Sequence, residues 1–339
     1  MGVFLLKIYG INIKVSSSSD FAFENLKKDF QLYLCGKIEN HLSRIININI
    51  FKEKPPYQKV PPLEASLYSL GAICYRDKDV HYIDYSGKCL MIYDFTRENA
   101  DIYSEYENLL YEKARLTILS RTGELLDKRH IHRVHAVGLA KDGDATICLL
   151  PMAAGKTTLA LDTLKKDSQI KLISDDICLM DSRNHVYPFM LRIGTRDRNS
   201  VNAIPEKYIT RIYREIYGEK YLIDLAYFEG RIAGKSRVRN ILIGKRIFQA
   251  DTEIRKIPKI KCYLPFIQCG VFGLGLPQIV ELFLRSGFRD ILNKINIVFS
   301  RTIIFLVIIS RANTYEIRIG RDLGMSADTL IDFINKPAE

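Results

Sequence analysis

A strand, a Gly-Lys-Thr loop and a helix follow one another at residues 144–166, and this order constrains the fold more than any other part of the chain. The apolar, β-branched run at 144–150 predicts a strand, and Leu159 and Leu164 give the segment 156–166 the apolar face of a helix. Backbone N–H groups at the start of such a helix bind phosphate, a lysine reaches the β- and γ-phosphates, and a threonine hydroxyl meets Mg²⁺. The segment therefore predicts an α/β fold with a phosphate-binding loop for ATP and Mg²⁺.

The loop departs from the full P-loop pattern at one position. That pattern is Gly, four residues, then Gly-Lys-Ser/Thr, and Leu150 stands where the first glycine belongs. Glycine normally permits a tight turn with positive φ, so Pro151 and two alanines must shape the turn here. The residues expected to bind the nucleotide are Ala153, Ala154, Gly155, Lys156, Thr157 and Thr158.

Two adjacent acids, Asp175 and Asp176, end the next predicted strand, 170–175. Phosphoryl transfer needs a metal ligand and a group that accepts the proton of the substrate hydroxyl, and carboxylates supply both. Because side chains alternate along a strand, we expect the two acids to point to opposite faces and to divide these roles. Thr157 and Asp176 are the expected Mg²⁺ ligands.

The runs Gly155-Lys-Thr-Thr-Leu-Ala-Leu and Leu172-Ile-Ser-Asp-Asp-Ile resemble the catalytic domain of the HPr kinase/phosphorylase family. Upstream, Arg133-Val-His135-Ala-Val-Gly138 resembles the strand on which that family carries a histidine. Downstream, Tyr187-Pro-Phe-Met-Leu-Arg192-Ile-Gly194 is similar to a segment of looser relatives, some of which phosphorylate peptides, including lasso-peptide precursors. The resemblance covers about residues 130–200.

This resemblance implies a catalytic set of Asp175, Asp176, His135 and Arg192. His135 would sit beside the acid pair and modulate its protonation; a satisfied core histidine is the alternative. Arg192 and Arg196 could neutralise the transferred phosphate, or could form surface salt bridges. The Glu-x-Arg-Gly segment of HPr kinase does not occur in this chain. The sequence therefore resembles a divergent relative and not the HPr kinase itself.

The element pattern predicts two domains. Residues 1–128 form a strand-rich domain closed by a long helix at 102–127, and residues 129–339 form the catalytic domain around a mixed, partly parallel sheet similar to that of HPr kinase and PEP carboxykinase. We expect further helices at 21–34, 205–217, 277–293 and 324–335, and a strand or hairpin at 3–15. Further strands are expected at 72–75, 80–85, 89–95, 133–139, 177–181, 184–187, 220–225, 238–243, 302–309 and 313–319.

Composition narrows the class of protein. No apolar tract reaches about 18 residues, and the densest one, Thr302–Ile309, is eight residues long and reads as a buried strand. We therefore expect no membrane span and a cytoplasmic location. The seven cysteines include no Cys-x-x-Cys, and the six histidines form no convincing metal site, so structural zinc and a disulfide framework are not expected.

The net charge is +11, and ten basic residues against two acids lie between Arg231 and Lys261. Such a run could attract an acidic or phosphorylated partner, or could be a solvated face. It lacks interleaved aromatic residues, and no helix-turn-helix or RNP-like motif is present, which argues against nucleic acid as a partner. The glycine-rich run Gly270–Gly275 is interpreted as a turn and not as a nucleotide contact.

These observations predict an ATP-dependent kinase that transfers a phosphoryl group to a hydroxyl, most simply a Ser or Thr of a protein or peptide. Two alternatives stay open: a regulatory module that binds nucleotide without turnover, favoured by the missing glycine, and a small-molecule kinase of the same fold. The expected partners are a nucleotide and a hydroxyl acceptor. The sequence leaves open a homo-oligomer.

Overall fold

The computed structural model describes residues 1–37, 44–69, 71–151, 154–214, 218–283 and 288–336. The chain divides into two compact units, and it passes between them more than once. Unit 1 comprises Met1–Leu126, Arg211–Lys220 and Pro277–Asp290, and unit 2 comprises Asp127–Thr210, Tyr221–Leu276 and Ile291–Glu339. Both units are thus built from segments that are distant in the sequence.

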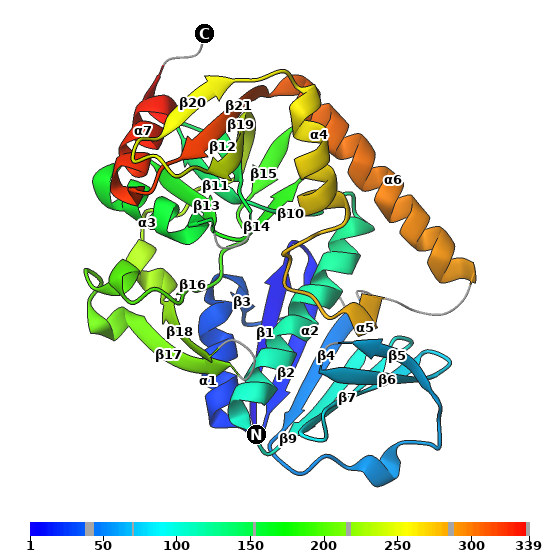
Figure 1. Ribbon diagram of the computed structural model, residues 1–339. Helices are drawn as coiled ribbons and strands as arrows, with labels where there is room; N and C mark the ends of the chain where they lie inside the picture. The colour runs from blue at the N-terminus through cyan, green and yellow to red at the C-terminus, as the bar shows by residue number, and fades with distance from the viewer. Residues whose placement is uncertain (38–43, 70, 152–153, 215–217, 284–287, 337–339) are drawn as a thin grey trace. The chain divides into compact units, whose positions relative to one another are not determined.

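Unit 1 is built on a nine-stranded mixed sheet with the strand order β3-β1-β2-β4-β9-β8-β7-β6-β5 (Figure 1). Strand β4 is parallel to both of its neighbours, β2 and β9. Its Ile46, Ile48 and Ile50 are fully buried, as expected for the inward face of a strand with period two. The strands are β1 Gly2–Ile8, β2 Ile11–Ser17, β3 Leu34–Cys35, β4 Ile45–Phe51, β5 Ala65–Ser69, β6 Ala72–Asp77, β7 Val80–Tyr85, β8 Cys89–Asp94 and β9 Asn99–Ser104.

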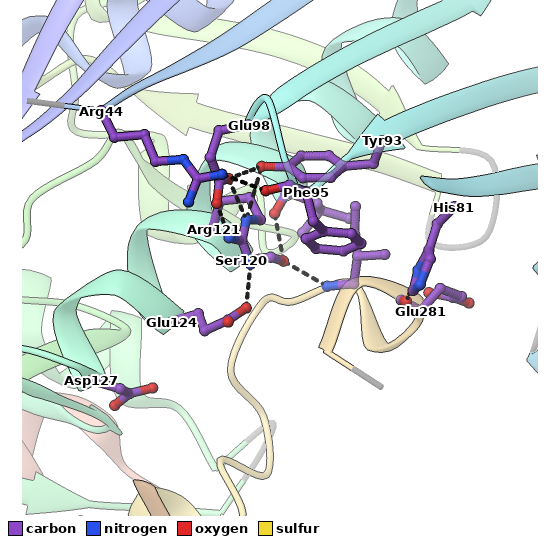
Figure 2. A network of polar contacts seen from close by, with 12 residues as sticks. Arg44, His81, Tyr93, Phe95, Glu98, Ser120, Arg121, Glu124, Asp127 and Glu281 are labelled. Atoms are coloured by element: carbon purple, nitrogen blue, oxygen red, sulfur yellow. Dashed lines mark hydrogen bonds and ion pairs between the residues drawn. The ribbon is translucent and has the colours of Figure 1, made fainter. Parts of the chain in front are cut away.

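A buried ionic network joins helix α2 (Glu107–Asp127) to the sheet of unit 1 (Figure 2). The Arg121 guanidinium, 1% exposed, donates to Glu98 Oε1 over 2.7 Å and to the Tyr93 hydroxyl over 2.8 Å, and it also pairs with Glu124. A buried charge is tolerated only when it is paired and hydrogen-bonded. Removing either partner of the Arg121–Glu98 pair should therefore destabilise unit 1.

Two shorter helices complete unit 1. Helix α1 (Asp20–Asp29) begins where Ser19 accepts a hydrogen bond from the Ala22 N–H, as a serine N-cap should. Helix α5 (Val280–Phe283) is held to the strands because the His81 Nδ1 lies 2.9 Å from the carbonyl oxygen of Glu281.

Unit 2 is a three-layer α/β/α structure around a second mixed sheet, with the path β10-β14-β15-β19-β12-β11-β13. Strand β21 pairs with β19 and β20, and the pairs β12–β19 and β19–β21 are parallel. The strands are β10 His132–His135, β11 Val137–Lys141, β12 Asp144–Leu149, β13 Lys171–Ser174, β14 Ile177–Met180, β15 His185–Tyr187, β19 Ser236–Arg246, β20 Glu253–Lys256 and β21 Asn313–Ile319.

Helices cover both faces of this sheet. Helices α3 (Lys156–Lys166) and α7 (Leu323–Asn335) pack on one face, together with Cys148 and Leu150. Helices α4 (Ile260–Phe266) and α6 (Phe288–Arg311) pack on the other, together with Ile147 and Leu149. The alternation of β12 residues between the two cores is the period-two pattern of a strand buried on both faces.

A small three-stranded sheet has the order β16-β18-β17. Its strands are β16 Ile193–Thr195, β17 Ile209–Arg214 and β18 Gly218–Ile223. The helix predicted over 205–217 is therefore wrong for the described residues, because Glu206–Tyr208 form one 3₁₀ turn and the chain then enters β17. The apolar residues Ile209, Ile212 and Tyr213 have helical spacing, but the segment is rich in β-branched and aromatic residues, which favour a strand.

The predicted buried strand at 302–309 is also wrong, because these residues lie inside the 24-residue helix α6. Their β-branched side chains favour a strand locally, but Ile304, Phe305 and Ile308 recur at helical spacing and pack into the core of unit 2. Within the described part of the chain, one helical segment, Asp290–Arg311, has the length and the apolar composition that could span a membrane. The expectation of no such segment rested on treating the eight-residue tract alone.

Candidate functional site

The loop between β12 and α3 reaches the helix through Gly155, whose φ of +88° is in the left-handed region. A Cβ at this position would lie 3.3 Å from Leu323 Cδ2, so side-chain space is also restricted. Helix α3 begins at Lys156, as predicted. Ala154 N–H donates to the Pro151 carbonyl over 3.2 Å, which closes the turn that precedes Gly155. Ala153 lies outside the described residues.

Leu150, at the position of the first P-loop glycine, is a core residue. Its side chain is 1% exposed and lies against Gly244 of β19 so closely that a Cβ at 244 would overlap it. A leucine here therefore packs into the core at the position where a P-loop has a glycine for its tight turn, and Gly244 of β19 leaves room for the leucine side chain.

The Lys156 ammonium is folded back onto its own loop. It donates to the carbonyls of Leu150 over 2.9 Å and Pro151 over 3.1 Å. Burial lowers the pKa of Lys156 below its ordinary value, and the negative charges of Asp176 and Asp175 oppose that shift. The lysine and both acids are therefore close enough for their charges to interact.

The two acids lie in the bend between β13 and β14, directly after β13 ends at Ser174, whereas they were predicted at the end of the strand itself. The Thr157 hydroxyl donates to Asp175 Oδ2 over 3.1 Å, so the first turn of α3 is bonded directly to the acid pair. Thr158 Oγ1 lies 3.2 Å from Ser200 Oγ. The argument from strand alternation does not apply in a bend, although the two carboxylates do have different surroundings.

The Asp176 carboxylate lies beside the His135 imidazole. The histidine Nδ1 lies 3.0 Å from Asp176 Oδ1, and the Asp176 side chain is 51% exposed. The imidazole itself is buried, and its Nε2 has no hydrogen-bond partner among the described residues. On its other side, Gly275 (φ +88°) approaches so closely that a Cβ there would lie 2.6 Å from the imidazole Cδ2. His135 is thus held beside the acid pair by strand β10 and the glycine-rich turn.

The two candidate arginines differ in their surroundings. Arg192 is buried, 3% exposed, immediately before β16, whereas Arg196 is exposed after that strand. A buried guanidinium is the stronger candidate for a fixed phosphate contact, because less side-chain freedom is lost on binding.

The oxygen donors at the site fit Mg²⁺. A threonine hydroxyl and two carboxylates are hard ligands of the kind that magnesium takes, with substrate phosphates and water completing the shell. Thr157 contacts Asp175 in this structure, and Asp176 contacts His135. No group of three or more His, Cys, Asp or Glu side chains that could hold a metal ion occurs in the described ranges.

Two neighbours of the site were not predicted from the sequence. The Cys269 thiol is near enough to Lys156 for the charge of each to act on the other's pKa, and burial raises the pKa of Cys269. Gly275 contacts His135 as described above. Gly275 belongs to the run Gly270–Gly275 that was interpreted as a turn, and Cys269 directly precedes that run. Its three glycines were the available signal, since close backbone approach to a site favours glycine.

The basic run 231–261 does not form one free face. The Arg231 guanidinium donates to three backbone carbonyls, at Leu164, Asp167 and Ile170. Lys245 and Arg255 pair with the buried Glu316, each over 2.8 Å. Arg231, Lys245 and Arg255 therefore bind other parts of the fold and are not available as a free basic surface.

Comparison with known proteins gives little family information. No protein-family model and no curated protein sequence matches the chain. Among solved structures, the HPr(Ser) kinase/phosphatase from Coxiella burnetii matches with 12% identity and a TM-score of 0.26, over 60% of this chain and 87% of that one. At so low a TM-score the likeness supports no functional argument. Any function must therefore be argued from the geometry of the site.

Proposed function

We propose that this protein is an ATP-dependent phosphotransferase whose site lies at the start of α3, between Lys156 and the acid pair. The observation that carries the proposal is the hydrogen bond from the Thr157 hydroxyl to Asp175. It joins the first turn of a helix that follows a Gly-Lys-Thr loop to the acids after the neighbouring strand, and this is the juxtaposition that phosphoryl transfer uses.

Each residue has a role that follows from its position. The N–H groups at the start of α3 would bind phosphate oxygens, and Lys156 would exchange its two loop carbonyls for the β- and γ-phosphates. Thr157 and an aspartate would hold Mg²⁺, which neutralises phosphate charge when bound. Arg192 would stabilise the transferred phosphate.

The remaining aspartate would accept the proton of the acceptor hydroxyl. Asp176, expected from the sequence to hold Mg²⁺, suits this role better because it is exposed and its carboxylate lies 3.0 Å from His135 Nδ1, whereas Asp175 is the acid that contacts Thr157. The proposed acceptor is a Ser or Thr hydroxyl of a protein or peptide.

A nucleotide-binding regulatory module is the second candidate. It is favoured by the hydrogen bonds of Lys156 to Leu150 and Pro151, which close the loop on itself, and by the leucine at the first glycine position. Binding of nucleotide without turnover would be the result.

One experiment separates the two functions. Purified protein is incubated with Mg²⁺, γ-labelled ATP and a cell extract, beside the Asp176→Asn variant, and nucleotide binding is measured by calorimetry. Label transfer that the variant loses supports the kinase. Nucleotide binding without transfer supports the regulatory module, and absence of binding rejects both.

A further inference from the structure

Helix α6 leaves an apolar stripe exposed along its length. Exposed fractions range from 42% to 65% for Leu292, Ile295, Phe299, Ile303 and Leu306, which recur every three or four residues and so share one side of the helix. Soluble monomers rarely expose a contiguous apolar surface of this kind unless it contacts a partner or a membrane.

Helix α4 runs antiparallel beside α6 and adds to this surface (Figure 1). Lys259 donates to the Ser310 carbonyl at one end, Arg301 donates to the Gly270 carbonyl over 3.2 Å further along, and the Phe266 and Phe305 rings pack between the helices at 5.3 Å. The exposed apolar residues of this second helix and its continuation are Ile260, Leu264 and Ile267, at 68%, 63% and 38% exposure. We call the eight exposed residues of the two helices the helix-pair face.

The charge around the helix-pair face has one sign. Residues 254–276 and 291–311 together contain seven basic residues and no acid, and two of the seven, Arg255 and Arg301, pair with acids outside these ranges. Lys256, Lys259, Lys261 and Arg311 are exposed and lie at the end where α4 begins and α6 ends. An apolar face with a cationic rim complements a surface that is apolar inside and anionic at its boundary.

We propose that the helix-pair face docks on the surface of an anionic lipid bilayer, with the apolar side chains in the acyl boundary and the lysines and Arg311 among the headgroups. A second copy of the chain fits less well, because a symmetric contact through this face would bring two cationic rims together. The proposal does not depend on the phosphotransferase activity.

The side of α6 opposite the helix-pair face packs in the core of unit 2. This favours docking on a membrane surface over spanning the membrane. Arg301 is 4% exposed and pairs with the buried Asp127 over 2.6 Å, and Asp127 also contacts His132 Nδ1 at 2.8 Å. The His132 Nε2 lies 3.0 Å from Ser300 Oγ. Moving α6 into a bilayer would break this buried network.

The test is flotation of the full chain with vesicles of phosphatidylcholine alone or of phosphatidylcholine with phosphatidylglycerol. We expect binding to the anionic vesicles only, weakened at least tenfold by raising salt from 0.05 to 0.5 M. The triple variant Leu264→Gln, Phe299→Gln, Leu306→Gln should lose binding at least tenfold, and so should Lys259→Gln with Lys261→Gln.

Matched variants control for general effects. Phe248→Gln removes an 84% exposed aromatic residue away from the helix pair, and Lys171→Gln with Lys207→Gln removes two exposed lysines elsewhere in unit 2, so neither should change binding. Circular dichroism checks that each variant is folded. Equal binding by the triple variant, no binding to either vesicle, or protein that only detergent and not high salt can extract would overturn the proposal. A dimer in sedimentation that the triple variant dissolves, without vesicle binding, would assign the face to a second copy instead.

Discussion

The Leu150 side chain fills the space beside the Gly244 backbone that a methyl group at 244 would need. Both residues face the core that α3 and α7 cover, and Leu150 is 1% exposed. The pair explains how the chain accommodates Leu150 at the position where the P-loop pattern has its first glycine. Packing of Leu150 on β19 fixes the start of the loop, where the P-loop pattern relies on the conformational freedom of a glycine.

This relationship predicts a non-additive mutant cycle. Leu150→Ala should lower the free energy of unfolding by about 2–5 kcal/mol through the cavity it leaves, and Gly244→Ala should lower it by about 1–3 kcal/mol through overpacking. The double variant should lose less than the sum, because each change relieves the other. Chemical denaturation measures all three. Gly234→Ala, where no atom lies within 4 Å of a new Cβ, is the control and should combine additively with Leu150→Ala.

Lys156→Ala should weaken Mg-ATP binding at least about tenfold, since a charge-assisted phosphate contact contributes about 1.5–3 kcal/mol. Isothermal calorimetry gives the affinity, and Lys171→Ala, an exposed lysine on β13, should leave it unchanged. Wild-type affinity in a folded Lys156→Ala protein would exclude the start of α3 as the phosphate site.

Asp175→Asn and Asp176→Asn should each slow phosphoryl transfer about 10²-fold or more while the fold is kept, because an amide oxygen can still accept the hydrogen bond from Thr157 but cannot act as a base or a good metal ligand. Transfer of labelled phosphate is the measurement. Asp162→Asn, on α3 and paired only with Lys165 among the contacts described, serves as the control. Normal turnover by both variants would make the acid pair structural.

Glu316 should make the free energy of unfolding fall as the pH is lowered into the acidic range. The hydrogen bond from Lys245 lowers the pKa of Glu316 against the effect of burial, and Arg255 lowers it further. A carboxylate with a lowered folded-state pKa contributes stability above its unfolded pKa of about 4.3, and the contribution is lost as pH falls through the folded pKa. Thermal unfolding should therefore find Glu316→Gln less stable than wild type at pH 7 and equally stable near pH 2. A constant difference over that range would contradict the assignment.

The sequence predicted the elements that carry their own local signal. Helix α3 and strand β21 have the predicted bounds, because the first follows a Gly-Lys-Thr loop and the second is rich in β-branched and aromatic residues. Cys148 and Cys178 are fully buried, as expected of small residues in apolar strands. The mixed α/β class and the partly parallel sheet follow from the same pattern.

Elements decided by tertiary contacts were missed. The tract 302–309 is helical because its inward residues pack on the sheet at helical spacing, although its composition favours a strand. At the site, the sequence indicated His135 and the acid pair, but not that Gly275 lies on the imidazole, since that contact joins residues 140 positions apart. The catalytic, nucleotide-binding and metal-binding roles of all the predicted site residues stay predictions.

The discontinuous composition of unit 1 has a consequence for the order of folding during synthesis. The carbonyl oxygen of Glu281 lies 2.9 Å from His81, and Ile279 N–H donates to Ser120 over 2.8 Å, so these early residues wait for partners about 160–200 positions later. A ribosome adding roughly 5–20 residues per second needs about 10–40 seconds to supply them. During that interval the sheet of unit 1 lacks helix α5, so the surface that α5 later covers is open to a chaperone.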